Sequence, residues 1–283
     1  MPSCNNMNDL ADAYGNFEVQ EVLVSAEANG SVAELMLEEG QLLEQGEPIG
    51  YIDTSGLALQ KDVLRAQRVA IRSRSENIRA ETRVLEEKKG ALLTEKKRVE
   101  NLLKDGAATT KQLDDLEQNI RVMEKQIEAV KSQMTNIQAE LNVVDTQIDQ
   151  VNDQLRKARI KAPMKGTVLE QYVEQFEMVT IGRPLFKMAD LDTLILRVYV
   201  SGSQLTHIRI GQKVFVYVDQ DDDEMLEFQG IVSWISSQAE FTPKIIQTKE
   251  ERVKLVYAAK ILVKNDGTLK IGMPGEVRFK TAN

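Results

Sequence analysis

Apolar residues recur at every seventh position through the middle of the chain. One column runs from Leu57 to Val99, and two further columns run from Leu113 to Leu155 and from Leu116 to Ala158. A seven-residue repeat of this length predicts helices that supercoil around a partner helix, because each apolar column then stays turned toward that partner. The stretch contains no proline, so nothing in it forces either helix to break.

The columns also predict where the chain reverses. When the outgoing column is paired with the first return column, the two residue numbers always add up to 212, from Leu57 with Leu155 to Val99 with Leu113. The midpoint is Gly106, and glycine readily adopts the positive φ that helix ends favour. We therefore predict an antiparallel helical hairpin, about 70 Å long at 1.5 Å per residue. The alternative is an intermolecular coiled coil kinked at Gly106, which the symmetry of the columns disfavours.

The outgoing helix is less apolar than the return helix. The positions at which its second seam is expected hold the polar residues Gln60, Gln67, Arg74 and Glu81. Two interpretations stay open. The column is either a face exposed to solvent, which is usual for charged helix positions, or a polar contact surface between neighbouring hairpins of a ring.

Two segments on either side of the predicted hairpin repeat each other. The segment AEANGSVAELMLEEGQLLEQGEPIGYI begins at Ala26 and APMKGTVLEQYVEQFEMVTIGRPLFKM begins at Ala162, so the two align without a gap at an offset of 136 residues. Glycine and proline recur at matched places, such as Gly46 and Gly182, and predict the same tight turns twice. Alternating apolar residues between the turns predict short strands. Because neither half can bury its apolar face alone, we expect both halves to pair into one small β-sandwich.

These half-motifs, split by a helical insertion, resemble the divided biotinyl and lipoyl domains of HlyD-type membrane fusion proteins. Those proteins are the periplasmic adaptor subunits of bacterial tripartite exporters. In a carrier domain, a lysine at the hairpin between the half-motifs bears the cofactor. Here the helical insertion replaces that hairpin, and Lys187 falls in the predicted final strand instead. The resemblance therefore implies a lipoyl-like domain that carries no cofactor.

The C-terminal third changes to short alternating segments, among them LILRVYV, KVFVYV, FQGIVSWI, VYAAKILV and GEVRF. Segments of this kind with turns between them predict a small antiparallel β-barrel. The stretch EFTPKIIQTKEERVKLVYAAKI, followed by IGMPGEV, resembles the branch of these adaptors that works with ABC-type exporters.

The predicted fold is an elongated α+β chain of several domains. A long antiparallel coiled-coil hairpin is inserted in a split lipoyl-like β-sandwich, and a small antiparallel β-barrel follows. The expected boundaries are an N-terminal tail over 1–16, the first half of the lipoyl-like domain over 17–54, the hairpin over 55–159 with its tip near 98–113, the second half over 160–190, and the barrel over 191–283.

The predicted tip, RVENLLKDGAATTKQL, contains three residues with a recognisable spacing. Arg98, Leu102 and Thr109 follow the pattern Arg-x3-Leu-x6-Ser of adaptors that dock onto TolC-like outer-membrane channels, with Thr in place of Ser. The resemblance implies that these residues contact the channel. The guanidinium of Arg98 offers several N–H donors in one plane, and Leu102 offers an apolar contact. Thr109 can cap the N-terminus of the return helix, with Gln112 at the capping-box position. The alternative is ordinary turn chemistry, with Leu102 in the hairpin core and Arg98 solvated.

Charge and side-chain chemistry narrow the possible functions. A net charge of −8 and a pI near 5.0 argue against nucleic acid as a partner. His207 is the only histidine, and the acidic run Asp219–Glu224 lacks the glycine and terminal glutamate spacing of a calcium loop. No phosphate-binding loop or nucleophile motif is present. We therefore expect no catalytic residue, metal site or cofactor, and no run of apolar residues is long enough to span a membrane.

Cys4 is the only cysteine, so the chain cannot form an internal disulfide. Two interpretations stay open for this residue. It is either the lipid-bearing cysteine of a bacterial lipoprotein or a free residue, because only three residues precede it and no lipidation signal can be read.

The resemblance also implies a function. It implies an adaptor in the periplasm of a Gram-negative bacterium, held at the inner membrane by a signal or anchor that this sequence does not contain. Such an adaptor links an inner-membrane transporter, here of ABC type, to a TolC-like channel and serves the export of drugs or other small molecules. It would be a non-catalytic homo-oligomer, a hexamer, in which the loop residue Gln175 would line the passage. The alternatives are a coiled-coil scaffold without a channel and a biotinyl or lipoyl carrier subunit.

Overall fold

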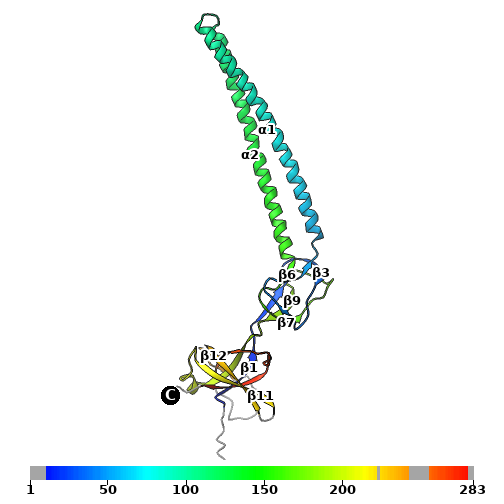
Figure 1. The fold of residues 1–283 in the computed structure, drawn as a ribbon, viewed down its shortest axis with the longest axis vertical. Helices are drawn as coiled ribbons and strands as arrows, with labels where there is room; N and C mark the ends of the chain where they lie inside the picture. Colours follow the sequence, from blue (N-terminus) through cyan, green and yellow to red (C-terminus); the bar gives the residue numbers. More distant parts are fainter. Residues whose placement is uncertain (1–10, 222–223, 242–254, 280–283) are drawn as a thin grey trace, which may run out of the picture. The chain divides into compact units, whose positions relative to one another are not determined.

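The computed structural model describes residues 11–221, 224–241 and 255–279, and Figure 1 shows its helices and strands. The chain divides into two units, which are described separately. One contains residues 27–33 and 51–159, and the other contains residues 1–26, 34–50 and 160–283. Cys4 lies outside the described residues.

The first unit is dominated by two long helices, α1 (Ser55–Lys104) and α2 (Thr110–Lys157), which pair as an antiparallel hairpin (Figure 1). At 1.5 Å per residue, α1 is about 75 Å long. The helices follow the predicted apolar columns closely, because the apolar side chains buried between them come from those columns. On α1 these are Ile71 and Val99, and on α2 they are Ile120, Ile127, Val130, Ile137, Val144, Ile148 and Val151, while the buried Ser75 of α1 lies outside the predicted columns. The predicted intramolecular hairpin is thus confirmed.

The second seam of α1 lies one residue later than expected. Gln60, Gln67, Arg74 and Glu81 are all exposed, and the residue that follows each of them is partly or fully buried except after Gln67. This actual column consists of Lys61, Ser75, Thr82, Lys89, Lys96 and Leu103, with the exposed Arg68 among them. Long cationic side chains can occupy a seam because the methylene stem packs on apolar surface while the charged end reaches water or an acidic partner.

Ion pairs between the helices show this arrangement. Arg68 meets Asp145 at 3.3 Å, Lys89 meets Glu124 at 2.7 Å, and Lys96 meets Glu117 at 2.8 Å. In these three pairs the residue numbers add up to 213, one more than the predicted register, whereas Arg74 with Glu140 and Glu86 with Lys131 add up to 214 and 217. Exposed pairs of this kind contribute little to stability. They mark which residues of α1 and α2 stand at the same height.

The lipoyl-like domain consists of two four-stranded sheets. Their orders are β2-β9-β7-β4 and β6-β5-β3-β8. The strands are β2 (Glu21–Ser25), β3 (Gly30–Leu35), β4 (Leu42–Leu43), β5 (Pro48–Ile52), β6 (Arg159–Lys161), β7 (Gly166–Gln171), β8 (Met178–Val179) and β9 (Pro184–Ala189). Shifting residue numbers by 136 exchanges β3 with β7, β4 with β8 and β5 with β9, and it converts one sheet order into the other. Each sheet therefore contains strands from both half-motifs, as the repeat predicted.

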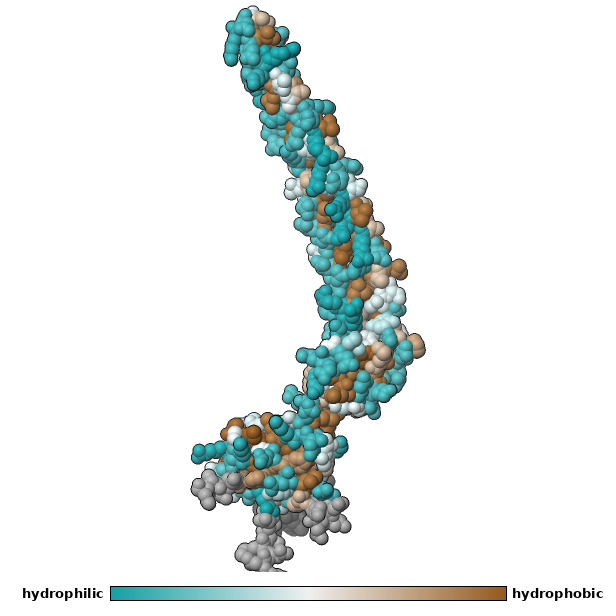
Figure 2. Space-filling model, in the orientation of Figure 1, coloured by the Kyte–Doolittle hydropathy of each residue, from teal (hydrophilic) through white to brown (hydrophobic). Residues whose placement is uncertain are grey.

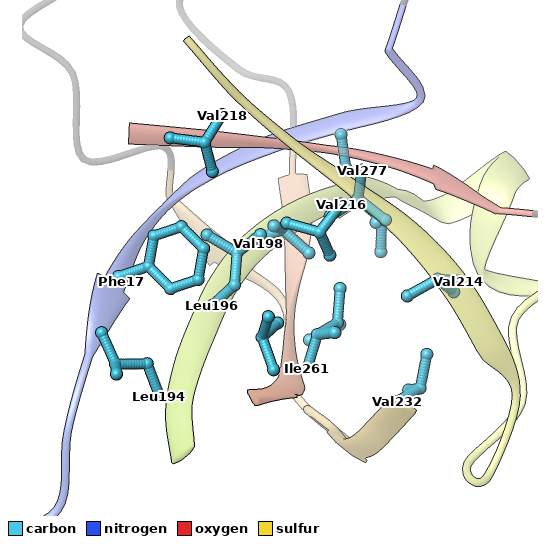
Figure 3. Packing of buried hydrophobic residues seen from close by; sticks show 14 of the residues in the cluster. Phe17, Leu194, Leu196, Val198, Val214, Val216, Val218, Val232, Ile261 and Val277 are labelled. Atoms are coloured by element: carbon cyan, nitrogen blue, oxygen red, sulfur yellow. The ribbon is translucent and has the colours of Figure 1, made fainter. Parts of the chain in front are cut away.

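The C-terminal sheet closes into a barrel of six strands. The order is β10-β1-β15-β11-β12-β14, and β14 pairs back with β10. The strands are β1 (Ala13–Glu18), β10 (Thr193–Ser201), β11 (Lys213–Asp221), β12 (Glu224–Ile235), β14 (Leu255–Lys264) and β15 (Pro274–Phe279), with the short β13 (Glu240–Phe241) added on β14 and the one-turn helix α3 (Gly202–Leu205) after β10. Figure 3 shows the apolar core, in which Leu196, Val216 and Ile261 are fully buried. The predicted barrel is confirmed.

One barrel strand comes from the N-terminal end of the sequence. The expected boundary after residue 16 divides residues 13–18 between the tail and the first half of the lipoyl-like domain, whereas β1 pairs with both β10 and β15 of the barrel. Phe17 is 1% exposed in the core (Figure 3), and Gly15 lies against β10 so closely that an added Cβ would stand 1.8 Å from the Arg197 carbonyl oxygen. The pairing of β1 therefore requires glycine at position 15.

Candidate docking site at the hairpin tip

The hairpin reverses through a glycine-dependent helix end. Gly106 has φ +76° and donates its N–H to the Leu103 carbonyl at 3.1 Å, while Ala107 donates to the Leu102 carbonyl at 2.7 Å. These two bonds form a Schellman motif, which satisfies the last carbonyls of α1. An added Cβ at Gly106 would meet nothing within 4 Å, so the backbone conformation and not the space demands glycine here.

Thr109 begins the return helix as predicted. It has extended backbone angles, and its Oγ1 accepts a bond from the Gln112 N–H at 3.4 Å. In return, Oε1 of the Gln112 side chain accepts a hydrogen bond from the Thr109 N–H at 2.8 Å. This reciprocal arrangement is a capping box. Serine would offer the same hydroxyl, which explains why threonine can stand in the serine place of the tip pattern.

Arg98 and Leu102 lie one helical turn apart on α1, so their side chains neighbour each other on one face. The Leu102 side chain is 40% exposed, which places it outside the hairpin core, whereas the next residue, Leu103, is partly buried. Arg98 is exposed and contacts the Glu95 carboxylate at 2.7 Å with one terminal nitrogen. A guanidinium carries five N–H donors, so Arg98 retains donors for a further partner.

A small network of charges lies just below the tip. Lys96 contacts Glu117 on α2 at 2.8 Å and Glu100 on its own helix at 3.6 Å, and Arg121 approaches Glu117 at 3.9 Å. The hydrogen bond from Lys96 lowers the pKa of Glu117, and the same bond raises the pKa of Lys96. Through these contacts the network connects α1 and α2 close to the turn at Gly106.

Gln175, the expected passage-lining residue, lies exposed in the turn between β7 and β8. Its neighbour Phe176 was not singled out from the sequence. Phe176 has φ +73°, a region that only glycine adopts easily, and its side chain is 74% exposed. The repeat contained the signal, because Phe176 aligns with Gly40, which has φ +84°. The second half-motif therefore keeps the turn but carries a large aromatic residue in it.

Lys187 lies in β9 and not in a turn. Its Nζ is 3.3 Å from Glu21 and 3.4 Å from Glu170, and bonds with Tyr172, Glu21 and Glu170 raise its pKa. Figure 1 places β9 within the lipoyl-like domain. A carrier lysine needs a mobile position at a hairpin, so the surroundings of Lys187 do not favour the carrier alternative.

The remaining expectations concern metals and membranes. His207 is exposed, with Nδ1 3.0 Å from the Thr206 hydroxyl. The acidic run Asp219–Glu224 lies partly outside the described residues. Among residues 11–221, 224–241 and 255–279, no three His, Cys, Asp or Glu side chains gather as metal ligands would. No helix in the described part of the chain is both long and apolar enough to cross a membrane.

The chain resembles known proteins over a part of its sequence and over most of its fold. No family model matches the chain. A "UPF0194 membrane protein" of Yersinia pseudotuberculosis is 33% identical over 103 residues, which are 36% of this chain and 31% of that protein. The chain thus matches about a third of the length of this curated relative.

Solved structures match nearly the whole chain. The periplasmic adaptor protein EmrA is 17% identical and covers 95% of this chain and 98% of its own, with a TM-score of 0.51. The membrane fusion protein Spr0693 of Streptococcus pneumoniae R6 is 15% identical with the same coverage, 95% and 98%, and a TM-score of 0.59. The chain therefore has the fold of membrane fusion and periplasmic adaptor proteins, and the resemblance noted in the sequence is confirmed at the level of the fold.

Proposed function

We propose that this chain is the periplasmic adaptor subunit of a tripartite exporter in a Gram-negative bacterium. It would link an inner-membrane transporter to a TolC-like outer-membrane channel for the export of drugs or other small molecules. The shared fold supports the adaptor class. The segment before β15 that resembles adaptors of ABC-type exporters supports an ABC transporter as the inner-membrane partner.

The observation that carries the proposal is the exposed pair Arg98 and Leu102 at the end of the hairpin. A Schellman motif and a capping box already complete the reversal, so the turn itself does not need an exposed leucine. Arginine is one of the residue types enriched among the few positions that supply most of an interface's binding energy, and burial of an exposed leucine adds apolar area to the contact. We assign Leu102 to an apolar pocket of the channel and Arg98 to its carbonyl or carboxylate groups, while Thr109 fixes the start of α2.

The proposed role is to assemble the exporter by binding its other components, and it involves no catalytic reaction. Each tip offers only a small contact, but several copies held in one oligomer would bind the channel together, and linked weak contacts gain strongly in overall affinity. A hexamer is the proposed form. In such a ring the turn with Gln175 would face the passage, and Cys4, if lipidated, would hold the adaptor at the inner membrane.

Photo-crosslinking in cells tests the channel contact. A photoreactive amino acid at position 102 is expected to capture an outer-membrane channel. The matched control is position 93, because Leu93 lies on the same helix and is exposed to a similar extent, 47% against 40%. Failure to capture the channel from position 102, or equal capture from position 93, would overturn the docking role.

Charge reversal gives a functional readout of the same contact. Arg98→Asp is expected to abolish export while leaving the helical circular dichroism unchanged, because Arg98 is an exposed residue. Lys97→Asp is the matched control, since Lys97 is an exposed cation one residue away. Export that survives Arg98→Asp would contradict the proposal.

A further inference from the structure

The barrel carries an exposed apolar patch on the outer side of three neighbouring strands. Ile231 on β12 stands opposite Leu262 on β14, and Leu262 stands opposite Ile195 on β10. Trp234 follows on β12, after a bulge, and stands opposite Lys260. Ile231 is 47% exposed, Leu262 and Trp234 are each 41% exposed, and Ile195 is partly buried. We call Ile195, Ile231, Trp234 and Leu262 the barrel patch.

The core of the barrel does not need the side chains of this patch. Successive residues of a strand point to opposite faces of a sheet. Figure 3 shows the neighbouring residues Leu194, Val232 and Ile261 in the core, and all three are fully buried. Figure 2 shows apolar side chains at the surface of the barrel beside hydrophilic ones. A contiguous group of exposed apolar residues commonly marks a place where a protein contacts another surface.

Two lysines without an acidic partner border the barrel patch. Lys213 on β11 stands opposite Ile231, and Lys264 follows Leu262 by two residues on the same face of β14. Both lysines are exposed, and neither forms an ion pair within residues 11–221, 224–241 and 255–279. The patch therefore has two free positive charges at its border.

The other charges close to the barrel patch are paired. Lys260 contacts Glu18 at 3.2 Å, and Arg197 contacts Glu240 at 3.1 Å. Each of these pairs is neutral in sum. The two unpaired lysines therefore decide the charge of this surface, which is positive.

Acidic residues gather on a different part of the barrel surface. Glu227 on β12 and Glu276 on β15 both stand opposite Tyr217 on β11, and Asp219 follows two residues along that strand. Glu227 and Asp219 are exposed. A negatively charged surface is repelled by this acidic region and attracted by the lysines beside the barrel patch. Charge therefore selects the side of the barrel that such a surface would meet.

Trp234 gives the barrel patch the chemistry of a membrane interface. Tryptophan is enriched where membrane hydrocarbon meets the headgroups, because its ring is apolar and its N–H is polar. Lys260 Nζ lies 5.8 Å from the centre of the Trp234 ring. Lysine stems pack on apolar surface while the ammonium groups reach anionic headgroups. An anionic bilayer therefore offers both the apolar and the charged groups that this surface requires, and it can adjust its shape to a sheet face.

The length of the chain keeps the barrel close to a membrane in the proposed function. Cys4 and Ala13, the first residue of β1, are nine residues apart. Nine residues span at most roughly 30 Å. A lipid on Cys4 would thus hold the barrel within this distance of the bilayer. In this respect the inference rests on the proposed function, whereas its test uses no lipid on Cys4.

We propose that the barrel patch, with Lys213 and Lys264 at its border, binds the surface of an anionic lipid bilayer directly. The apolar side chains of the patch enter the headgroup region, and the two lysines contact lipid phosphates. This contact orients the barrel on the membrane and does not depend on a lipid anchor.

The fluorescence of Trp234 tests the contact, because it is the only tryptophan of the chain and reports on the patch alone. The purified full chain carrying Cys4→Ser is mixed with vesicles of phosphatidylcholine, either pure or with added phosphatidylglycerol. We expect a blue shift of the emission, and quenching by brominated lipids, with the anionic vesicles only. Added salt should weaken the binding, since it screens the attraction between lysines and headgroups.

Variants separate the charged and apolar contributions. Lys213→Gln with Lys264→Gln should weaken vesicle binding about thirtyfold, because each lysine near an anionic surface contributes about fivefold. Lys88→Gln with Lys97→Gln is the matched control, since it removes the same charge from two exposed lysines of α1, and it should bind as before.

Leu262→Ser should weaken the binding about fivefold through the loss of apolar area. Met225→Ser is its control, because Met225 is exposed to a similar extent, 47%, at the other end of β12. Unchanged circular dichroism would show that each of these variants is folded.

The proposal is overturned if anionic vesicles leave the Trp234 emission unchanged, if neutral vesicles shift it equally, or if the patch variants bind like their controls. Patch variants that lower export while Trp234 ignores every vesicle would assign the patch to a protein partner instead, which also overturns it. None of these results bears on the channel contact, which is judged by position 102.

Discussion

The two half-motifs of the lipoyl-like domain share one backbone plan, but they place very different residues in the turn that follows β3 in one and β7 in the other. Gly40 and Phe176 occupy the same place in these turns, with φ +84° and φ +73°. Left-handed backbone costs a non-glycine residue about 1–2 kcal/mol. Phe176 is 74% exposed, so burial of its ring does not offset that cost. The difference teaches that the second turn keeps its left-handed backbone even with a large, mostly exposed side chain in it.

Buried positions show the opposite behaviour. Val32 and Val168 are matched residues with 0% and 1% exposure, so both copies retain the same side chain where packing decides. On the surface, the matched residues Met36 and Tyr172 have diverged. Comparison of the two half-motifs therefore distinguishes buried residues that the packing of the domain requires from exposed residues that this packing does not constrain.

The largest expected effect comes from breaking a shared core position. Val168→Asp would bury a carboxylate without a partner, and changes of this kind rank among the most destabilising, at about 4 kcal/mol or more. Val32→Asp should do equal damage, because the two positions are equivalent. Loss of hydrogen-exchange protection in β7 and β9 measures the effect. Met178→Asp, at a residue 68% exposed, is the control and should change little.

The second largest effect is expected when the turn after β3 receives the aromatic residue that the turn after β7 carries. Gly40→Phe should lower the free energy of unfolding by about 1–2 kcal/mol, because the new side chain must adopt left-handed backbone. Space is not the obstacle, since an added Cβ at Gly40 would meet nothing within 4 Å. Urea unfolding measures the change. An unaltered stability would show that this turn tolerates side chains for a reason other than its conformation.

The reverse exchange should have a smaller effect and the opposite sign. Phe176→Gly is expected to stabilise the domain by about 1 kcal/mol through release of backbone strain, less the added freedom of glycine in the unfolded chain. Phe176→Ala removes the ring but keeps the strain, so its stability should stay close to that of the natural chain. If both variants lower export, the Phe176 ring contacts another molecule. If Phe176→Gly instead lowers the free energy of unfolding, the ring stabilises the domain by packing against it.

The smallest effect concerns a charged cluster that only the second copy has. Glu170, Tyr172 and Lys187 occupy the places of Glu34, Met36 and Tyr51. The pKa of Glu170 lies below its ordinary value of 4.5, mainly because the Tyr172 hydroxyl donates a hydrogen bond to the carboxylate. A hydrogen bond from Lys187 lowers this pKa further. A lowered carboxyl pKa stabilises the fold above the unfolded-state pKa, and this stabilisation is lost as pH falls through the folded-state value.

An NMR titration of the Glu170 carboxyl checks this cluster. Tyr172→Phe removes the hydroxyl that contacts Glu170 at 2.8 Å, so the Glu170 pKa should rise toward 4.5. Glu117, whose pKa is lowered by the hydrogen bond from Lys96 in the hairpin, serves as the internal control and should keep its pKa. An unchanged Glu170 pKa in the variant would mean that Tyr172 does not hold this carboxylate.

Local chemistry explains which features the sequence could predict. Seven-residue columns, the glycine at position 106 and the Thr109 capping box depend on residues close in the chain, and each was found where expected. The second seam was misplaced by one residue because Lys89 and Lys96 count as polar, although their stems pack between the helices. β1 was missed because Gly15 and Asn16 weaken its strand pattern, and its partners β10 and β15 lie far along the chain.

The barrel closure through β1 has a consequence for the order in which the molecule is made. β1 precedes the other described strands in the chain, yet one of its neighbours, β15, ends at Phe279. Whichever way the chain is delivered from its N-terminal side, about 260 residues separate β1 from the end of that neighbour, so β1 is present before its partner is available. The lipoyl-like domain and the hairpin are complete long before then. The barrel is thus the last part to close, and in the interval an unpaired strand edge near the N-terminus is open to other chains.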